Sequence, residues 1–359
     1  MLTQSNKIDF NGQHFYVGLD VHLKSWKVSI MAEKLTLKTF SQDPRPELLH
    51  HYLVKNFPNG TYHSAYEAGF CGYWIHNKLT ALGIDSIVVN PADIPTTNKE
   101  KVSKTDKRDS KKIAKCLRNG ELKGIHVPSL KTLEDRCLVR TRGTLVKDLS
   151  RNKNRIKSFL YFHGIEMPEK FKQMSTHWSN RFMNWLRSIE LSEYSAKKSL
   201  TLIIDESEHL RLIILDATKG IRELSQSETY ANHVQLLRSI PGIGILTAMI
   251  VLTEIEAISR FNNFDNLCSF IGLVPTTHSS GDKDIIGEIT IRGNNFLRSA
   301  IVESAWIAAR KDMVLNKCYH DYCKRMEPNK AIIRIARKLL NRIRYVLKNN
   351  QPYVYSVIK

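Results

Sequence analysis

Residues 15–21 read Phe15-Tyr16-Val17-Gly18-Leu19-Asp20-Val21, and this stretch sets the expected fold of the N-terminal part. Large apolar side chains alternate with other residues, which is the pattern of a β-strand with one face on a core. Asp20 stands where this strand ends. A second strand-like run with Val28 and Ile30 follows closely, so the two runs predict a hairpin.

The chain continues with alternating strand and helix patterns up to residue 130. The expected elements are strands at 63–67 and 84–89 and helices at 71–82 and 107–117. Pro91 and Pro95 break the chain before the last of these helices. This alternation predicts a mixed α/β sheet domain over residues 1–130.

Four acidic residues stand at strand ends or at the start of a helix in this domain: Asp20, Glu67, Asp106 and Asp109. Asp106 and Asp109 are three residues apart, so on a helix capped by Thr105 they share one face. Carboxylates gathered in one place repel each other unless a cation neutralises them, and hard oxygen ligands select Mg²⁺ or Mn²⁺. The alternative is that these are four unrelated surface acids.

The segment 131–237 is helical and less rich in glycine and proline. Leucine, isoleucine and similar residues recur with a four-three spacing at Leu145, Leu149, Asn152, Ile156 and Phe159, and again at Leu210, Ile214, Ala217, Ile221 and Leu224. That spacing is typical of a coiled coil. Two long helices suit an antiparallel hairpin or a subunit interface, and an ordinary helical pair within one monomer fits the spacing equally well.

The last segment, 238–359, begins with a glycine-rich turn between two helical patterns. Pro241-Gly242-Ile243-Gly244 leaves backbone N–H groups free at the start of a helix, which is a favourable seat for a phosphate. Gly242 and Gly244 are therefore candidate nucleic-acid contacts. The alternative is a tight turn in which glycines adopt dihedral angles that other residues avoid.

A polar turn further on carries the candidate nucleophile. It reads His278-Ser279-Ser280-Gly281, and Arg292 and Arg298 lie downstream. A serine in such a turn could attack a phosphate, with the arginines stabilising the developing charge or contacting nucleic acid. A serine in an ordinary surface loop is the alternative that this pattern leaves open.

The charge balance indicates what kind of molecule the protein meets. With 54 Lys and Arg against 35 Asp and Glu, the formal net charge is +19, and the predicted pI is about 9.6. Nucleic acid is the usual partner of so basic a protein, and a membrane surface is the rival. The basic amphipathic pattern at 329–348 predicts a helix that is either simply solvated or in contact with phosphates, and the net charge favours phosphates.

The sequence also bears on the cellular compartment. It has no run of eighteen apolar residues to span a bilayer, and residues 1–10 lack the apolar centre of a signal peptide. Its six cysteines form no C-x-x-C pair, which favours reduced thiols. We therefore expect a cytosolic protein.

Taken together, these segments resemble the DEDD insertion-sequence transposases, a family that includes the Piv/MooV DNA invertases. The N-terminal likeness lies in Gly18-Leu19-Asp20-Val21-His22, in Tyr66-Glu67-Ala68-Gly69 with Cys71-Gly72-Tyr73, and in Lys104-Thr105-Asp106-Lys107-Arg108-Asp109. The C-terminal likeness lies in Pro241-Gly242-Ile243-Gly244, Phe270-Ile271-Gly272-Leu273-Val274-Pro275, His278-Ser279-Ser280-Gly281 and Ile291-Arg292-Gly293-Asn294.

The resemblance implies an architecture and a site. It implies a RuvC-like, RNase H-type first domain in which the four acids hold Mg²⁺, a helical coiled-coil connector, and a mainly α C-terminal transposase domain with a catalytic serine. The family pattern most often keeps that serine directly before the glycine, which selects Ser280 over Ser279.

The resemblance also implies partners. Members act on donor and target DNA and use a guide (bridge) RNA from the element's own non-coding end. Their active sites are thought to be composite between subunits, so a homo-oligomer, dimer or tetramer, is expected here. A bacterial or archaeal cytoplasmic setting, associated with the nucleoid, follows from the same likeness.

Two other functions remain open from the sequence. One is a RuvC-like nuclease or resolvase that hydrolyses DNA with the acids alone. The other is a non-catalytic protein that binds nucleic acid by charge. Neither accounts for the presence of both sets of motifs in one chain.

Overall fold

The computed structural model describes residues 9–95, 106–280 and 283–355, with the backbone alone for 106–107, 277–280 and 283–286. The chain divides into two compact units, Met1–Val127 and Pro128–Lys359. The first unit contains the mixed α/β sheet. The expected connector and C-terminal domain both fall within the second unit, so the division between them at residue 237 remains a prediction.

The first unit is built on a five-stranded sheet in the order β3-β2-β1-β4-β5. The strands are β1 (His14–Val21), β2 (Trp26–Met31), β3 (Thr36–Gln42), β4 (Thr61–Glu67) and β5 (Asp85–Val89). The first three are antiparallel neighbours, whereas β4 and β5 run parallel to β1. This mixed sheet is consistent with a RuvC-like domain. The sequence pattern predicted the β1–β2 hairpin but did not reveal β3.

Helices cover both faces of this sheet. On one face, α1 (Pro46–Asn56) and α2 (Trp74–Ala81) bury their apolar side chains against Phe15, Val17 and Leu19. On the other face lies α4 (Asp106–Arg118), which crosses β1 at Gly18. The helix α1 was absent from the sequence-based prediction.

Gly18 lets α4 approach the sheet closely. A Cβ at this position would collide with the backbone carbonyl oxygen of Ser110 and the backbone amide of Ala114. Beside it, the Ser110 hydroxyl lies 2.9 Å from the hydroxyl of Ser29 on β2, and both serines are buried. The glycine therefore fixes the distance between the strand that carries Asp20 and the helix that carries Asp109.

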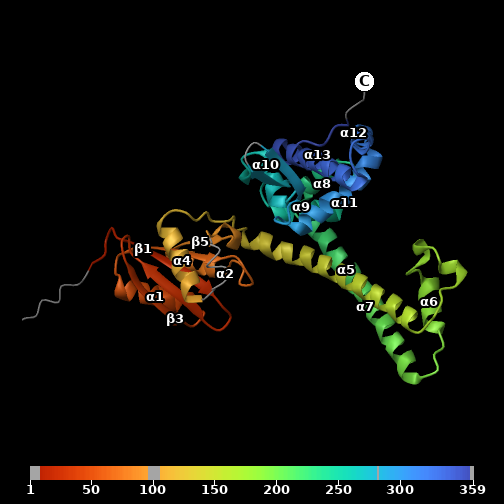
Figure 1. Cartoon of the computed structure of the whole chain (residues 1–359), viewed down its shortest axis with the longest axis horizontal. Coiled ribbons are helices and arrows are strands. Elements are labelled where there is room, and N and C mark those ends of the chain that lie inside the picture. The colour runs from red at the N-terminus through yellow and green to blue at the C-terminus, as the bar shows by residue number, and fades with distance from the viewer. Residues whose placement is uncertain (1–8, 96–105, 281–282, 356–359) are drawn as a thin grey trace, which may run out of the picture. The chain divides into compact units, whose positions relative to one another are not determined.

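The second unit begins with two long helices, α5 (Leu130–Phe162) and α7 (Tyr194–Ser225), which lie side by side in Figure 1 with α6 (Asn180–Ser188) near their far end. Arg142 donates to Thr218 at 2.7 Å and Arg155 to Glu206 at 2.8 Å, so the helices are antiparallel. A coiled coil is not confirmed, because Leu145 and Leu149 are only half-buried.

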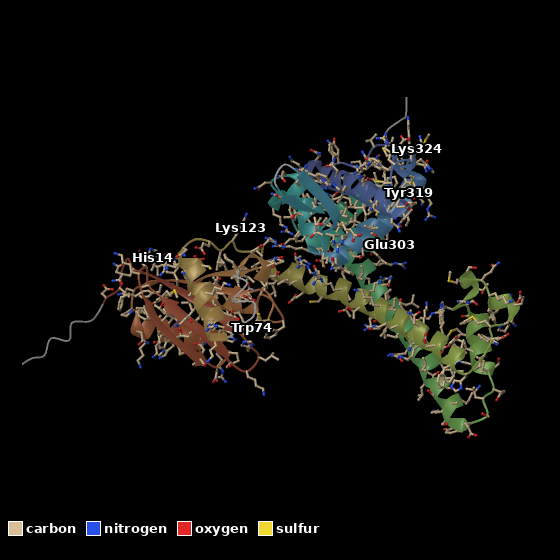
Figure 2. All side chains as sticks on the ribbon, in the orientation of Figure 1. His14, Trp74, Lys123, Glu303, Tyr319 and Lys324 are labelled. Atoms are coloured by element: carbon tan, nitrogen blue, oxygen red, sulfur yellow. The ribbon has the colours of Figure 1, made fainter. Side chains whose placement is uncertain are left out.

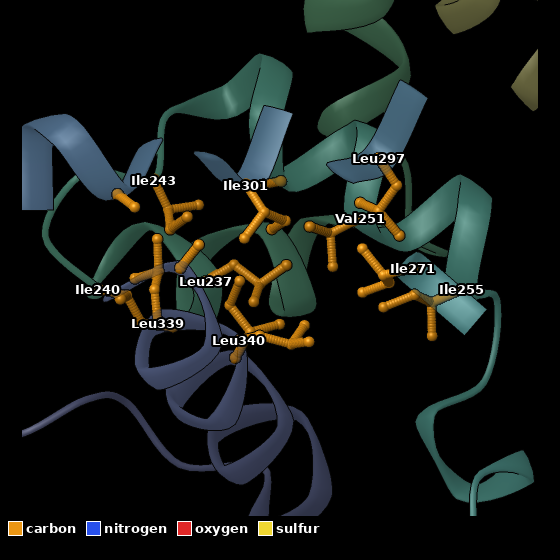
Figure 3. Close-up of a cluster of buried hydrophobic side chains, with 14 of the residues drawn as sticks. Leu237, Ile240, Ile243, Val251, Ile255, Ile271, Leu297, Ile301, Leu339 and Leu340 are labelled. Carbon is orange, nitrogen blue, oxygen red and sulfur yellow. The ribbon is translucent and has the colours of Figure 1, made fainter. Parts of the chain in front are cut away.

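Six further α-helices and a strand pair are described in the rest of this unit. They are α8 (Ala231–Arg238), α9 (Ile245–Ile255), α10 (Phe264–Ile271), β6 (Pro275–Ser280), β7 (Lys283–Ile289), α11 (Asn295–Lys311), α12 (Met313–Cys323) and α13 (Pro328–Asn349). Their shared core includes Leu237, Ile301 and Leu340, all fully buried (Figure 3). Over the described ranges, no helix is long and apolar enough to cross a membrane.

Candidate active site

The first two predicted acids lie at the same edge of the sheet. Leu19 of β1 pairs with Tyr66 of β4 in parallel register. Asp20 and Glu67 are the residues that directly follow this pair, each at or next to the carboxyl end of its strand. Strand geometry therefore brings the two carboxylates to neighbouring positions, and both residues are partly exposed there.

The other two acids belong to the helix that crosses β1. Asp109 precedes Ser110, whose carbonyl oxygen lies against Gly18, two residues before Asp20. Asp106 is the first residue of α4, and its side chain lies outside the described residues. The four predicted positions thus come from three elements in contact, β1, β4 and α4.

The loop after Glu67 is held by the preceding tyrosine. The Tyr66 hydroxyl donates to the carbonyl oxygen of Gly72 at 3.0 Å, and it accepts from the backbone N–H of His76 at 3.3 Å. Burial raises the pKa of Tyr66, so the hydroxyl stays protonated and can donate. Tyr66 and Gly72, which has a positive φ of 56°, therefore fix the chain that leaves Glu67.

A histidine contacts the first acid. His22 Nε2 lies 3.2 Å from Oδ2 of Asp20, just after β1 ends. The sequence motif contained His22, but the spacing gave it no role. Because His22 lies two residues after Asp20, where the chain leaves the sheet, its position in the sequence could have predicted this contact.

The donor chemistry of this region fits a hard divalent cation, because Asp20, Glu67 and Asp109 all offer carboxylate oxygens. No three carboxylate, histidine or cysteine side chains within the described part of the chain are grouped closely enough to hold a metal ion. Since the Asp106 side chain is outside that part, the four-carboxylate metal site remains a prediction.

The serine segment, which its sequence indicated to be a polar turn, belongs to a strand hairpin. Strands β6 and β7 are antiparallel, with Ser279 opposite Asp284 and Ser280 opposite Lys283. Ser280 is the last residue of β6, and the next two residues, 281 and 282, lie outside the described residues. The hairpin thus places Ser280 at its tip.

Arg298 secures the base of this hairpin. Its Nη1 donates to the carbonyl oxygens of Gly272, at 3.1 Å, and Thr290, at 2.6 Å. These two residues lie just before β6 and just after β7. Its Nη2 donates to the Asn295 side chain. Arg298, predicted as a nucleic-acid contact, therefore has a positioning role that the sequence did not reveal.

Two glycines allow the hairpin's flanking segments to touch. Gly272 and Gly293 have φ of +81° and +130°, and a Cβ on Gly293 would lie 2.6 Å from the Gly272 Cα. The next residue, Asn294, caps α11 by accepting from the Leu297 N–H at 3.0 Å. The Ile291-Arg292-Gly293-Asn294 motif is thus explained largely by packing, with Arg292 itself exposed.

A buried carboxylate connects this motif to α5. Glu254 of α9, with a side chain only 1% exposed, accepts from Arg140 at 2.6 and 2.8 Å. It also accepts from the Asn294 side chain at 2.7 Å, and Arg136 lies 3.9 Å away. Burial alone would raise the pKa of Glu254, but these partners outweigh it and the pKa is lowered.

Replacing Glu254 with Gln should lower the free energy of unfolding at pH 7 by about 1–3 kcal/mol, because the half-exposed Arg140 loses its charge-assisted hydrogen bonds to the buried carboxylate. A group with a lowered folded pKa contributes stability above its unfolded pKa and loses it as the pH falls through the folded value. The wild-type advantage should therefore shrink below about pH 4.3. Urea denaturation of the wild type and the variant, at pH 7 and again below about pH 4.3, measures the difference in the free energy of unfolding.

The exposed acid Glu303 supplies the control, since Glu303→Gln should change the free energy of unfolding by less than about 0.5 kcal/mol. Equal stability of the Glu254→Gln variant and the wild type at pH 7 would contradict the importance of this network.

The glycine-rich turn has two different glycines. Gly242 has φ of +90°, and a Cβ there would lie 2.5 Å from the carbonyl oxygen of Ser304 on α11, so this glycine serves packing. Gly244 is the N-cap of α9 and has open space around its Cβ position. No side chain caps the first amides of α9. The backbone N–H groups at Gly244 and the start of α9 therefore have no side-chain cap, as the predicted phosphate-binding turn requires.

Two family models match the chain over the segments that carry these residues. One, a transposase model of the DEDD IS110 type, matches residues 17–164 and includes all four predicted acids. The other, described as "Transposase IS116/IS110/IS902 family", matches residues 234–320 and includes the serine hairpin and the glycine-rich turn. Both models describe transposases, so the class of protein that the chain matches is that of the DNA transposases.

Curated relatives give the same result. The transposase for insertion sequence element IS1533 of Leptospira borgpetersenii is 29% identical over 69% of this chain and 71% of its own length. The pilin gene-inverting protein of Moraxella bovis is 31% identical over 53% of this chain and 59% of its own. The Sinorhizobium fredii protein y4qE is 30% identical over 67% of this chain, and the match spans only 57% of that relative.

The chain belongs to the IS110/IS116 family of transposases, which are enzymes that cut and rejoin DNA.

Proposed function

We propose that this protein cuts and rejoins DNA with two sets of reactive residues, the carboxylates of its first unit and a serine of its second. The proposal rests on one observation: in the same chain, the backbone places both sets of residues at defined positions. Asp20 and Glu67 follow a parallel strand pair, and Ser280 ends β6 at the tip of a secured hairpin. A nuclease that used the acids alone would have no need of the second arrangement.

Asp20, Glu67, Asp106 and Asp109 are proposed to hold Mg²⁺ or Mn²⁺. When bound, the cation would supply positive charge to the phosphodiester and polarise it. The residues' own task is to keep several carboxylates close together, which Gly18 supports by fixing α4 against β1.

Ser280 is proposed to be the nucleophile. Its Oγ loses a proton and forms a bond to phosphorus, while the bond from phosphorus to one strand's oxygen breaks and that oxygen takes up a proton. A hydroxyl of the partner strand then attacks the same phosphorus, and Ser280 leaves. One phosphoester bond replaces another at each step, so no ATP is needed.

Nucleic-acid contacts are proposed at Arg292 and at the Gly242–Gly244 turn. Arg292 is exposed next to the base of the serine hairpin, and the amides that begin α9 have no side-chain cap. Arg298 could act on nucleic acid only in addition to its carbonyl contacts, so its proposed role is to position the hairpin.

A guide RNA and a homo-oligomer, dimer or tetramer, complete the proposal. The net charge of +19 supports contacts with more than one nucleic acid. Leu212 and Leu215 of α7 are 65% exposed and could pack against another subunit.

Strand exchange in vitro tests the proposed function. Protein purified with its co-purifying RNA should join donor and target duplexes in the presence of Mg²⁺, and EDTA or ribonuclease should each abolish joining. Sequencing of the RNA should match the flank of the element that encodes the protein. Hydrolysis without joining would favour a nuclease, and joining that survives ribonuclease would remove the guide RNA from the account.

A further inference from the structure

The C-terminal helix α13 has one face buried and one face in solvent. Its apolar residues belong to the core of the second unit, and Leu339 and Leu340 point into that core in Figure 3. Because this apolar face is covered, α13 has no free apolar side to insert into a lipid surface. Whatever α13 binds must meet its outer face.

The basic residues of α13 separate into two groups. Arg342 donates to the buried Asp312 at 2.8 Å, and Arg337 donates to the carbonyl oxygen of Leu273 at 3.1 Å, so both serve the fold. The others are not engaged in this way, and Lys330, Arg334, Lys338 and Lys348 are fully on the exposed side.

The exposed group forms one row, here called the outer row: Lys330, Arg334, Lys338, Tyr345 and Lys348. The spacings of three, four and seven residues place them on one side of the helix. The row is about 27 Å long, at about 1.5 Å per residue. Tyr345, 58% exposed, is its only aromatic member.

No acid balances the outer row within its own helix. Between Pro328 and Asn349 there are seven basic residues and no acidic ones. Like charges four residues apart, such as Lys330 with Arg334, destabilise a helix by about 0.2–0.5 kcal/mol per pair. Helix faces that are merely solvated usually mix both signs. The uniform row therefore indicates a polyanionic partner.

The neighbouring helix α12 orders one member of the outer row. Its own exposed lysine, Lys324, labelled in Figure 2, follows the end of α12 and pairs with Asp321 at 2.9 Å. Arg334 lies over the ring of Tyr322 at 5.5 Å, which holds its guanidinium group beside the helix. The row is thus partly preorganised before any partner binds.

We propose that the outer row of α13 binds the phosphate backbone of double-stranded DNA without reading its sequence. Four cations along a straight row can neutralise about four phosphates of a duplex, which carries one charge per ~1.7 Å of its axis. DNA is the partner because the chain belongs to a transposase family. The proposal requires neither the metal site nor Ser280.

The test compares two variants that lose the same charge. The first combines Lys330→Gln, Arg334→Gln and Lys338→Gln in the outer row. The second combines Lys34→Gln, Lys55→Gln and Lys198→Gln, three exposed lysines elsewhere in the chain. Binding to a random-sequence DNA duplex is measured in EDTA at several salt concentrations, so that no catalysis contributes.

The outer-row variant should bind at least about tenfold more weakly at about 0.1 M salt, and its slope of log K against log salt should fall by about 2.7, or ~0.9 per contact. The control variant should keep the wild-type slope to within about 0.5. The single variant Arg334→Lys should keep the wild-type slope, whereas Lys338→Gln alone should lower it by about 0.9.

Unchanged DNA binding by a folded outer-row variant would overturn the proposal, and so would equal losses in both triple variants. A loss confined to a structured RNA, with duplex DNA binding intact, would also overturn it and identify RNA as the occupant. If the triple variant does not fold, the slope of log K against log salt for Lys338→Gln tests the proposal instead. These binding experiments do not depend on catalysis, so they test the proposal even if the wild-type protein shows no strand exchange.

Discussion

Replacing Asp20 with Asn should reduce strand exchange by about a thousandfold while leaving DNA binding near the wild-type level. Asn keeps the size of the side chain and can still meet His22, but it removes the negative charge that a divalent cation needs. Loss of a metal's charge stabilisation is worth several kcal/mol, and about 4 kcal/mol corresponds to that factor. Joined product is measured under single-turnover conditions.

Asp85 provides the matched control in the same sheet. It begins β5, at the opposite end of a strand parallel to β4, and contacts His63 at 2.9 Å. Asp85→Asn removes the same charge from the same unit and should leave strand exchange within about threefold of the wild type. Wild-type exchange by Asp20→Asn, or an equal loss in both variants, would contradict the proposed metal site.

The first unit shows how much of a fold local pattern can reveal. Alternation predicted β1 and placed Asp20 at its end, and the short run at 63–67 correctly ended at Glu67. Strand β3 was missed because it lies at the sheet's edge with largely exposed side chains, which removes the alternation. The reason for Gly18 lies in a helix more than ninety residues later, which no local pattern contains.

The second unit shows what residue type alone leaves out. Arg298 was predicted to contact nucleic acid because it is basic and near the serines; that contact stays a prediction, and the structure adds that Arg298 donates to two backbone carbonyl oxygens. Glu254 went unnoticed, although one acid in the apolar run 245–255 required a buried partner. Its partner, Arg140, is 114 residues away, and only tertiary structure could identify it.

The serine segment was expected as a polar turn because it is polar and contains glycine. The structure pairs β6 with β7 in this segment, and the isoleucines at 285, 286 and 289 were the β-strand signal that was missed. This difference matters for function. A hairpin held at its base by Arg298 can present Ser280 in a fixed place, whereas an unrestrained loop could not.

Replacing Ser280 with Ala should abolish strand exchange and remove a covalent protein–DNA intermediate. A serine hydroxyl that stores the phosphoester bond allows rejoining without an external energy source, whereas hydrolysis leaves a break. The loss should be at least about a thousandfold, because the variant has no oxygen to attack phosphorus. Ser279→Ala, one residue earlier on the same strand, is the matched control and should retain exchange.

Trapping that intermediate tests the central claim most directly. The wild-type protein is incubated with Mg²⁺, its co-purified RNA and a nicked suicide duplex from which the cleaved strand end diffuses away, and the protein is then digested and its peptides sequenced. The account predicts a nucleotide adduct on Ser280, present in Ser279→Ala and absent in Ser280→Ala. Cleavage of the duplex with no adduct on any peptide, or an adduct that persists in Ser280→Ala, would contradict it.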